Sequence, residues 1–124
     1  MSNIAKKILV VDDEPDIVEY LRFVLEGAGY EITTALDGQQ ALKSIEAARP
    51  DLVLLDQMMP LMEGSEVLRR LKADEQTKDI PVVMLTAQDS AADMMKGWQS
   101  GTDLYLLKPI MGAELVDYIN CILA

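Results

Sequence analysis

Residues 6–15 read KKILVVDDEP, and this stretch decides the fold. Four consecutive apolar residues, Ile8–Val11, stop abruptly at the acidic pair Asp12 and Asp13. A continuous apolar run predicts a strand that is covered on both faces, as in a parallel sheet, because a half-exposed strand alternates apolar with polar residues. Doubly wound parallel sheets bind ligands at the carboxyl ends of their strands. The acidic pair therefore marks the edge where a functional site is expected.

Four further stretches of the chain have the character of strands, and stretches with apolar residues at helical spacing lie between them. The predicted strands are Ile8–Val11, Tyr30–Ala35, Leu52–Leu55, Val82–Leu85 and Leu104–Leu107. The second strand is more polar than the others, as expected at the edge of a sheet. The apolar residues that predict helices fall within 17–25, 41–45, 67–71, 91–98 and 115–123. Strict alternation of strand and helix predicts an α/β fold, a five-stranded parallel sheet with helices on both faces.

Composition restricts the kind of protein. The length of 124 residues fits one domain, 1–124, with no effector domain after it. The net charge of -10 disfavours direct binding to nucleic acid or anionic lipid, and no stretch reaches the ~20 apolar residues of a membrane span. Histidine is absent, which excludes histidine bases and histidine metal ligands. Cys121 is the only cysteine, so an internal disulfide is impossible and a reducing cytoplasmic location is favoured.

The predicted strand ends carry a set of reactive side chains. Asp12 and Asp13 follow the first strand, Asp56 the third, Thr86 the fourth and Lys108 the fifth. Two unit charges ~4 Å apart interact by about 4 kcal/mol at an effective dielectric near 20, so clustered carboxylates need a neutralising partner. A hard divalent cation such as Mg²⁺ provides one. A carboxylate can also attack phosphorus, while a lysine and a hydroxyl stabilise the transferred group.

Each of these residues also has a purely structural explanation. Asp13 before Glu14-Pro15 is typical of a helix start, and threonine favours strands. Asp56 fits a turn residue, and a lysine before proline fits a loop. Their coincidence at successive strand ends favours a functional site over four separate accidents.

The ordered motifs resemble those of response-regulator receiver domains from about residue 7 to residue 123. VVDDE at 10–14 resembles the acidic pocket, and DQMMPLMEG at 56–64 resembles the phosphorylation loop, with Glu63 where aspartate is common. Thr86-Ala87 resembles the switch-threonine step, and GTDLYLLKP at 101–109 the signature of the last strand. The resemblance implies a flavodoxin-like strand order, 2-1-3-4-5. It also implies a phosphorylation-dependent switch of a two-component system, a phosphoacceptor rather than an enzyme.

The resemblance further implies a metal site. Asp13 and Asp56 would bind Mg²⁺ directly, together with the backbone carbonyl of Met58. Asp12 would act mainly through a bound water. Glu14 is interpreted as a charge at the helix start rather than as a ligand.

The remaining roles concern the phosphoryl group, and the resemblance implies these as well. Asp56 would accept it, and Lys108 would pair first with Asp56 and then with the phosphoryl oxygens. Thr86 would bond a phosphoryl oxygen, after which Tyr105 would turn inward as the switch residue. Because the chain has no histidine, the donor would be a partner, either a sensor histidine kinase or a histidine phosphotransfer protein.

Two alternatives remain. A receiver-like module could act by interaction without phosphorylation, although such proteins usually lose one of the site residues that are kept here. A flavodoxin-like binder would need a hydroxyl- or glycine-rich phosphate loop after the first strand, where this chain has acids. Labelling by acetyl phosphate in the presence of Mg²⁺ separates the three.

Several other side chains are expected to be structural, and one surface is expected to carry the output. The methionine pairs at 58–59 and 94–95 and Trp98 are interpreted as packing residues, and Cys121 as a small buried or half-buried group. The output face would include Leu104, where receivers joined to winged-helix DNA-binding domains commonly have an acid. No Lys or Arg follows Lys108. We therefore expect an apolar patch with an acidic rim, and no salt-bridged dimer on activation.

Overall fold

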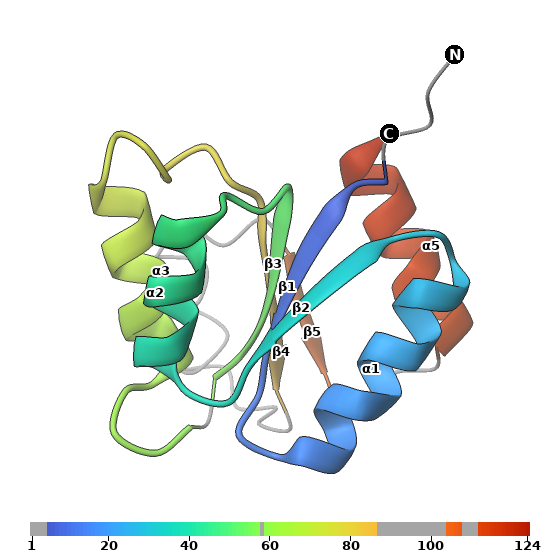
Figure 1. Cartoon of the computed structure of the whole chain (residues 1–124), viewed down its shortest axis with the longest axis horizontal. Helices are drawn as coiled ribbons and strands as arrows, with labels where there is room; N and C mark the ends of the chain where they lie inside the picture. The colour runs from blue at the N-terminus through green and yellow to red at the C-terminus, as the bar shows by residue number, and fades with distance from the viewer. Residues whose placement is uncertain (1–4, 58, 87–103, 108–111) are drawn as a thin grey trace.

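The computed structural model describes residues 5–57, 59–86, 104–107 and 112–124, which form a parallel sheet with helices on both sides (Figure 1). In chain order the elements are β1 (Lys7–Val11), α1 (Pro15–Gly27), β2 (Glu31–Ala35), α2 (Gly38–Ala47), β3 (Leu52–Asp56), α3 (Gly64–Ala73), β4 (Val82–Thr86), β5 (Leu104–Leu107) and α5 (Gly112–Leu123). The strand order is β2-β1-β3-β4-β5, and all neighbours pair in parallel. The predicted fold class and strand order are confirmed.

The apolar runs supply two separate cores, one on each face of the sheet. Successive side chains of a strand point to opposite faces. Leu9 and Val11 of β1 pack in the core under α2 and α3, whereas Ile8 and Val10 pack in the core under α1 and α5. All four are at most 1% exposed. A strand that serves two cores must be apolar at every position, which explains why the sequence shows runs instead of alternation.

The edge strand and the helix starts follow from local sequence. β2 lies at the edge of the sheet, and only its last residue, Ala35, is buried, as its polar sequence predicted. Pro15 occupies the start of α1, where its missing N–H costs nothing. The Asp37 carboxylate caps α2 by accepting a hydrogen bond of 2.8 Å from the Gln40 amide. Local sequence therefore favours the starts of α1 and α2, through Pro15 and the Asp37 cap.

One sequence prediction about the helices is wrong. Cys121 was expected to be buried or half-buried, but it is exposed. The face of α5 that enters the core holds Leu115 and Ile119, one helical turn apart. A residue two positions beyond Ile119 lies about 200° further around the helix, at ~100° per residue, and therefore faces solvent.

The remaining sequence predictions about packing divide into two groups. Met59 is buried in the core under α2 and α3, as predicted. The helix predicted at 91–98, with Trp98 and the methionines at 94–95, lies outside the described residues, as does Met58. Within the part of the chain that the structure describes, none of the helices has both the length and the apolar character needed to cross a membrane.

Candidate metal site

Three carboxylates meet at the carboxyl edge of the sheet. Asp12 and Asp13 directly follow β1, and Asp56 is the last residue of β3. These strands are neighbours, and Val11 pairs with Leu55, so the residues that follow lie beside each other. One carboxylate oxygen from each aspartate lies within 4.8 Å of the others. The structure therefore brings together the three acids that the sequence placed at this edge.

The cluster has the chemistry to hold a divalent cation. Asp12 and Asp56 are buried, with exposures of 1% and 4%, and Asp13 is half-buried. Buried carboxylates are costly unless they are hydrogen-bonded, paired or bound to a metal. Hard cations such as Mg²⁺ and Ca²⁺ prefer oxygen ligands, and all three side chains offer them. Burial of two ligands and half-exposure of the third would leave an approach from solvent.

Asp12 also builds the turn that leads into α1. Its carboxylate accepts a hydrogen bond of 3.0 Å from the Glu14 amide, and its own amide donates to the Ala35 carbonyl of β2 at 3.2 Å. Glu14 is the N-cap residue of α1, and its side chain makes no capping hydrogen bond. The structural and the functional explanations of the acidic pair are therefore compatible. One carboxylate oxygen of Asp12 holds the turn, and the pair still faces Asp56.

The loop after Asp56 is held against the first turn of α3. The Gly64 amide donates to the Gln57 carbonyl at 3.0 Å. A Cβ atom at Gly64 would lie 2.3 Å from the carbonyl oxygen of Asp56, closer than any real contact. Only glycine therefore allows α3 to begin this close to the backbone of the third acid.

Gln57 is a site-supporting residue that the sequence analysis missed. It is buried, and its side-chain oxygen accepts a hydrogen bond of 2.8 Å from the Ser65 amide. Its side-chain nitrogen contacts the Ser65 hydroxyl at 3.4 Å. Gln57 thus ties the residue after Asp56 to the start of α3. The partners are eight residues apart and share no helical or strand periodicity, so only the folded structure reveals the link.

The same loop contains a strained residue. Leu61 has a φ of 70°, and it is the only non-glycine residue with positive φ in the described part of the chain. The Met62 amide donates to the Pro60 carbonyl at 2.7 Å, which closes a three-residue turn around Leu61. The Leu61 side chain is 96% exposed. The loop therefore holds a leucine away from the core in an unfavourable backbone conformation.

The other predicted site residues lie on or next to the neighbouring strands. Thr86 is the last residue of β4 and pairs with Leu107 of β5. Asp56 of β3 pairs with Leu85, the residue before Thr86. Tyr105 pairs with Met84 in the same register. The side chains of Thr86 and Tyr105 lie outside the described part of the structure, as do Lys108 and Met58 entirely. The roles of these four residues remain predictions.

The fold and the acidic edge define a class of protein. A family model, the response regulator receiver domain, matches residues 8–120. The chain therefore belongs to the receiver-domain family, as the motifs at its strand ends had indicated. It is a receiver domain of the kind found in two-component response regulators.

The chain is similar in sequence to a response regulator and to a transcriptional regulatory protein. The DNA-binding response regulator MtrA of Mycolicibacterium smegmatis is 46% identical over 97% of this chain and 51% of its own length. The alkaline phosphatase synthesis transcriptional regulatory protein PhoP of Bacillus subtilis is 44% identical over 95% of this chain and 48% of its own length. The chain thus spans about half the length of these relatives.

Solved structures agree with the fold. The chemotaxis protein CheY4 of Vibrio cholerae superposes with a TM-score of 0.91 at 33% identity, covering 96% of this chain and 99% of that one. A putative response regulator from Chloroflexus aurantiacus gives a TM-score of 0.92 at 36% identity, over 97% of this chain and 98% of that one. Both matches extend over nearly the whole chain.

Proposed function

We propose that this chain is a phosphorylation switch in which Asp56 accepts a phosphoryl group. The observation that carries the proposal is the placement of Asp12, Asp13 and Asp56, with carboxylate oxygens within 4.8 Å of one another at the ligand-binding edge of the sheet. Membership of the receiver family supports it. In this proposal the chain is a phosphoacceptor that assists its own phosphorylation and dephosphorylation, and not an enzyme with a separate substrate.

Mg²⁺ is the cofactor that the donor set fits. Asp13 and Asp56 would bind it directly with the backbone carbonyl of Met58, and Asp12 would act through a bound water. When bound, the ion would neutralise negative charge on the phosphoryl oxygens. Asp12 is suited to the outer position because one of its oxygens already accepts the Glu14 amide.

In this proposal, each step of the phosphoryl transfer to Asp56 is assigned to a residue of the chain. A carboxylate oxygen of Asp56 attacks phosphorus, the phosphorus–nitrogen bond of a donor phosphohistidine breaks, and the imidazole leaves with the electron pair and takes up a proton from water. Lys108 would offset charge on the phosphoryl oxygens and Thr86 would hydrogen-bond one of them, after which Tyr105 would turn inward. The chain has no histidine, so a sensor histidine kinase or a histidine phosphotransfer protein would supply the group.

The output and the location belong to the same proposal. MtrA is named as DNA-binding and PhoP as a transcriptional regulator, so a transcriptional output through another part of a longer protein is a natural extension. The receiver itself, with a net charge of -10, is not expected to contact nucleic acid or anionic membrane directly. A single cysteine fits a reducing cytoplasm.

The test is labelling by acetyl phosphate, followed by mass spectrometry of the intact protein. The wild type should gain one phosphoryl group only when Mg²⁺ is present, and Asp56→Asn should gain none. Asp79→Asn is the matched control, because Asp79 is an exposed aspartate outside the cluster, and it should label like the wild type. Full labelling of Asp56→Asn would reject the assignment. A folded wild type that takes up no label would favour a phosphorylation-independent interaction module.

A further inference from the structure

The residue that follows Asp56 is a buried amide with both of its polar atoms engaged. Gln57 is 3% exposed, and its side-chain oxygen accepts a hydrogen bond of 2.8 Å from the Ser65 amide. Its side-chain nitrogen donates to the Ser65 hydroxyl at 3.4 Å, and that hydroxyl donates to a Glu63 carboxylate oxygen at 3.4 Å. An ionised carboxylate can only accept, so this order of donors fixes which way the Gln57 amide faces.

The backbone makes further contacts at the same place. The Gly64 amide donates to the Gln57 carbonyl at 3.0 Å. Gly64 also lies so close to Asp56 that a Cβ atom there would be 2.3 Å from the Asp56 carbonyl oxygen. Backbone and side-chain bonds from Gln57 to Gly64 and Ser65 therefore close the base of the loop after Asp56. We call these bonds the Gln57 clasp.

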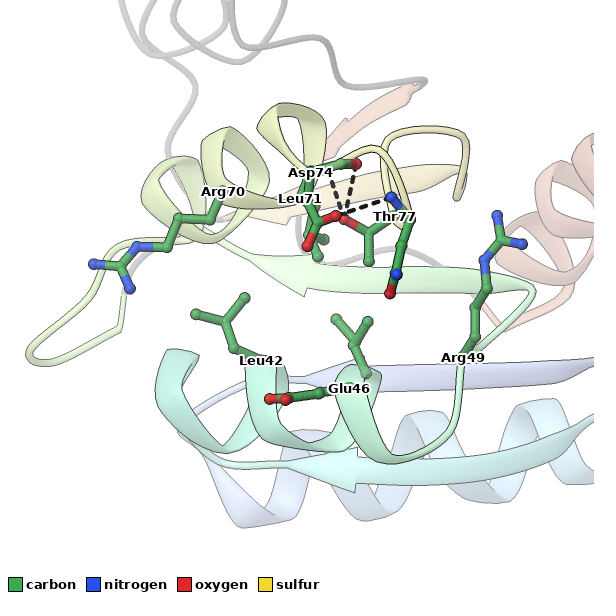
Figure 2. A pocket seen from close by; sticks show the side chains of 9 residues that line it. Leu42, Glu46, Arg49, Arg70, Leu71, Asp74 and Thr77 are labelled. Carbon is green, nitrogen blue, oxygen red and sulfur yellow. Dashed lines mark hydrogen bonds between the residues drawn. The ribbon is translucent and has the colours of Figure 1, made fainter.

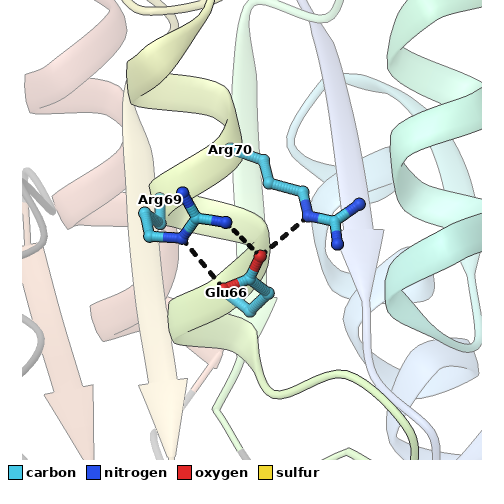
Figure 3. A network of polar contacts seen from close by, with 3 residues as sticks. All are labelled: Glu66, Arg69 and Arg70. Atoms are coloured by element: carbon cyan, nitrogen blue, oxygen red, sulfur yellow. Dashed lines mark hydrogen bonds and ion pairs between the residues drawn. The ribbon is translucent and has the colours of Figure 1, made fainter.

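The clasp can hold Asp56 only if the helix at its other end is fixed, and α3 is fixed along its length. Val67 and Leu68 on its inner side are fully buried in the core. On its outer side, the Glu66 carboxylate accepts hydrogen bonds of 3.0 and 2.6 Å from Arg69 and one of 2.8 Å from Arg70 (Figure 3). These bonds connect residues one helical turn apart and stiffen the part of α3 that follows the clasp.

The C-terminal end of α3 is held as well. The Thr77 hydroxyl donates to the Leu71 carbonyl at 2.7 Å, and the Thr77 amide donates to the Asp74 carbonyl at 3.0 Å (Figure 2). The Lys72 ammonium donates to the Ile80 carbonyl, in the segment that leads into β4, at 3.2 Å. Gln57 is therefore tied to a helix that is anchored both to the core and to the segment before β4.

We propose that Gln57 is a positioning residue for the acidic site. By tying the backbone after Asp56 to α3, it holds the Asp56 carboxylate beside the other two acids. Because Asp56 and Gln57 share a rigid peptide group, freeing Gln57 would let the backbone at Asp56 turn and move its carboxylate away from the cluster. The inference rests on the proposed function, since it concerns the same Mg²⁺ site.

The experiment compares Mg²⁺ affinity in the wild type and in Gln57→Met by calorimetric titration. Methionine has a length and volume close to those of glutamine, but it has neither the oxygen nor the N–H groups of the clasp. Residues that orient a metal ligand commonly contribute about 10- to 100-fold to affinity, so Gln57→Met should bind Mg²⁺ about tenfold more weakly or worse. Labelling by acetyl phosphate at saturating Mg²⁺ should also become slower, because the nucleophile is held less precisely.

Gln40→Met is the matched control. Gln40 also follows a strand, and its side-chain oxygen accepts a hydrogen bond of 3.1 Å from the Leu36 amide at the start of α2. A bond that serves stability alone changes the urea midpoint and leaves the Mg²⁺ affinity of the folded protein unchanged. Gln40→Met should therefore bind Mg²⁺ like the wild type. Equal weakening in both variants, or wild-type affinity in Gln57→Met, would overturn the proposal.

A measurement on the wild type needs no substitution and carries no risk for folding. Coupling between two sites is reciprocal, so Mg²⁺ should strengthen the clasp as the clasp strengthens Mg²⁺ binding. Hydrogen exchange at the Ser65 amide should slow on addition of Mg²⁺, whereas exchange at the Leu36 amide should not. Unchanged exchange at Ser65 would contradict a positioning role.

The titration and the labelling separate this inference from the proposed function. A wild type that binds Mg²⁺ more tightly than Gln57→Met but takes up no label would reject phosphorylation and would support the positioning role. A wild type that takes up label, with the same Mg²⁺ affinity in Gln57→Met, would support phosphorylation and reject the positioning role.

Discussion

Individual residues at the acidic edge serve both local structure and chemistry. Asp12 holds the turn into α1 with one oxygen and joins the carboxylate cluster with its side chain. Asp56 is buried at the end of a strand, where its backbone contacts Gly64. Replacing such a residue, even by one of the same shape, should measurably change stability or metal binding. Each residue can therefore be tested separately.

Asp13 should matter for metal binding more than any exposed acid nearby. Asp13→Ala should weaken Mg²⁺ binding by at least about tenfold, which corresponds to ~1.4 kcal/mol. This loss is a fraction of the attraction between two opposite unit charges ~4 Å apart, which is about 4 kcal/mol at an effective dielectric near 20. Calorimetric titration measures it. Asp16→Ala, an exposed acid in the first turn of α1, controls for the loss of one negative charge. Equal affinities in Asp13→Ala and the wild type would exclude Asp13 as a ligand.

Leu61 is expected to destabilise the fold through its backbone. Left-handed conformation costs an L-residue about 1–2 kcal/mol, and glycine avoids that cost while losing about 0.5–1 kcal/mol of chain entropy. Leu61→Gly should therefore raise the free energy of unfolding by about 0.5 kcal/mol or more in urea titrations. Leu61→Ala keeps the Cβ atom and removes only a side chain that is 96% exposed, so it should change little. Destabilisation by the glycine variant would mean that the turn is not strained.

At the scale of elements, α3 links two surfaces. Its first residue packs on Asp56, Gln57 bonds to its second residue, and Arg70 lines a pocket between α3 and α2. The helix also carries Arg70 and Lys72 in its last turn, where the helix dipole favours bases. Its position is set at one end by close backbone contact and along its length by Val67, Leu68 and Leu71 in the core.

The close approach of α3 to β3 predicts a sharp contrast between two glycines. Gly64→Ala should lower the free energy of unfolding by about 3 kcal/mol, because the new Cβ atom meets backbone that must shift. It should also slow labelling by acetyl phosphate, since Asp56 moves with that backbone. Gly27→Ala at the end of α1 meets nothing within 4 Å and should be neutral or stabilise by about 0.5 kcal/mol. Equal stability of the two variants would contradict the packing described here.

The ion pairs of Glu66 predict a pH dependence. The pKa of Glu66 is lowered from 4.5 to about 2, so its contribution to stability is complete above 4.5 and is lost as the pH falls through about 2. The difference in unfolding free energy between the wild type and Glu66→Gln should follow this window. The pairs are largely exposed, so the difference should be small and should shrink in high salt. A difference that is constant from neutral pH to pH about 2 would rule out these ion pairs as its source.

At the scale of the whole molecule, charge is divided between faces. α1 and α5 lie on one side of the sheet and are net negative, while α3 on the other side is net positive (Figure 1). α5 carries Glu114 and Asp117, and no base in its last turn. A small pocket of about 320 Å³ lies on this helix and is lined by these acids with Tyr118 and Cys121. The acidic rim predicted for the output face is consistent with these residues, whereas the side chain of Leu104 lies outside the described structure.

The absence of bases on α5 predicts how the activated protein behaves. Salt-bridged pairing of receivers through this face needs opposite charges from the last helix, and α5 cannot supply the positive ones. The protein treated with beryllofluoride and Mg²⁺ should therefore sediment as it does untreated, at the same concentration. A tight activated dimer that is abolished by Glu114→Gln or Asp117→Asn would show that the face pairs through these acids after all.

By itself, the sequence determined the fold and most of the candidate site. Burial of both faces forces runs such as Ile8–Val11 to be apolar throughout, so strands, alternation and parallel topology can be read from composition along the chain. The topology then requires that residues at the ends of neighbouring strands meet, which is why Asp12, Asp13 and Asp56 could be grouped in advance. Such predictions need only the pattern of each single element and the general rule that parallel strands end at the same edge of the sheet.

Only the tertiary structure decided the features that depend on how two elements pack. Cys121 is exposed because α5 turns Leu115 and Ile119 toward the core. The many apolar residues of this helix do not determine from sequence alone which face is buried. Gln57 bonds to Ser65, and residues of α2 and α3 line a common pocket. No helical or strand periodicity in the sequence pairs these residues. Sequence periodicity records which side of an element is buried, whereas the partner of each side chain is set by packing of complementary shapes in three dimensions.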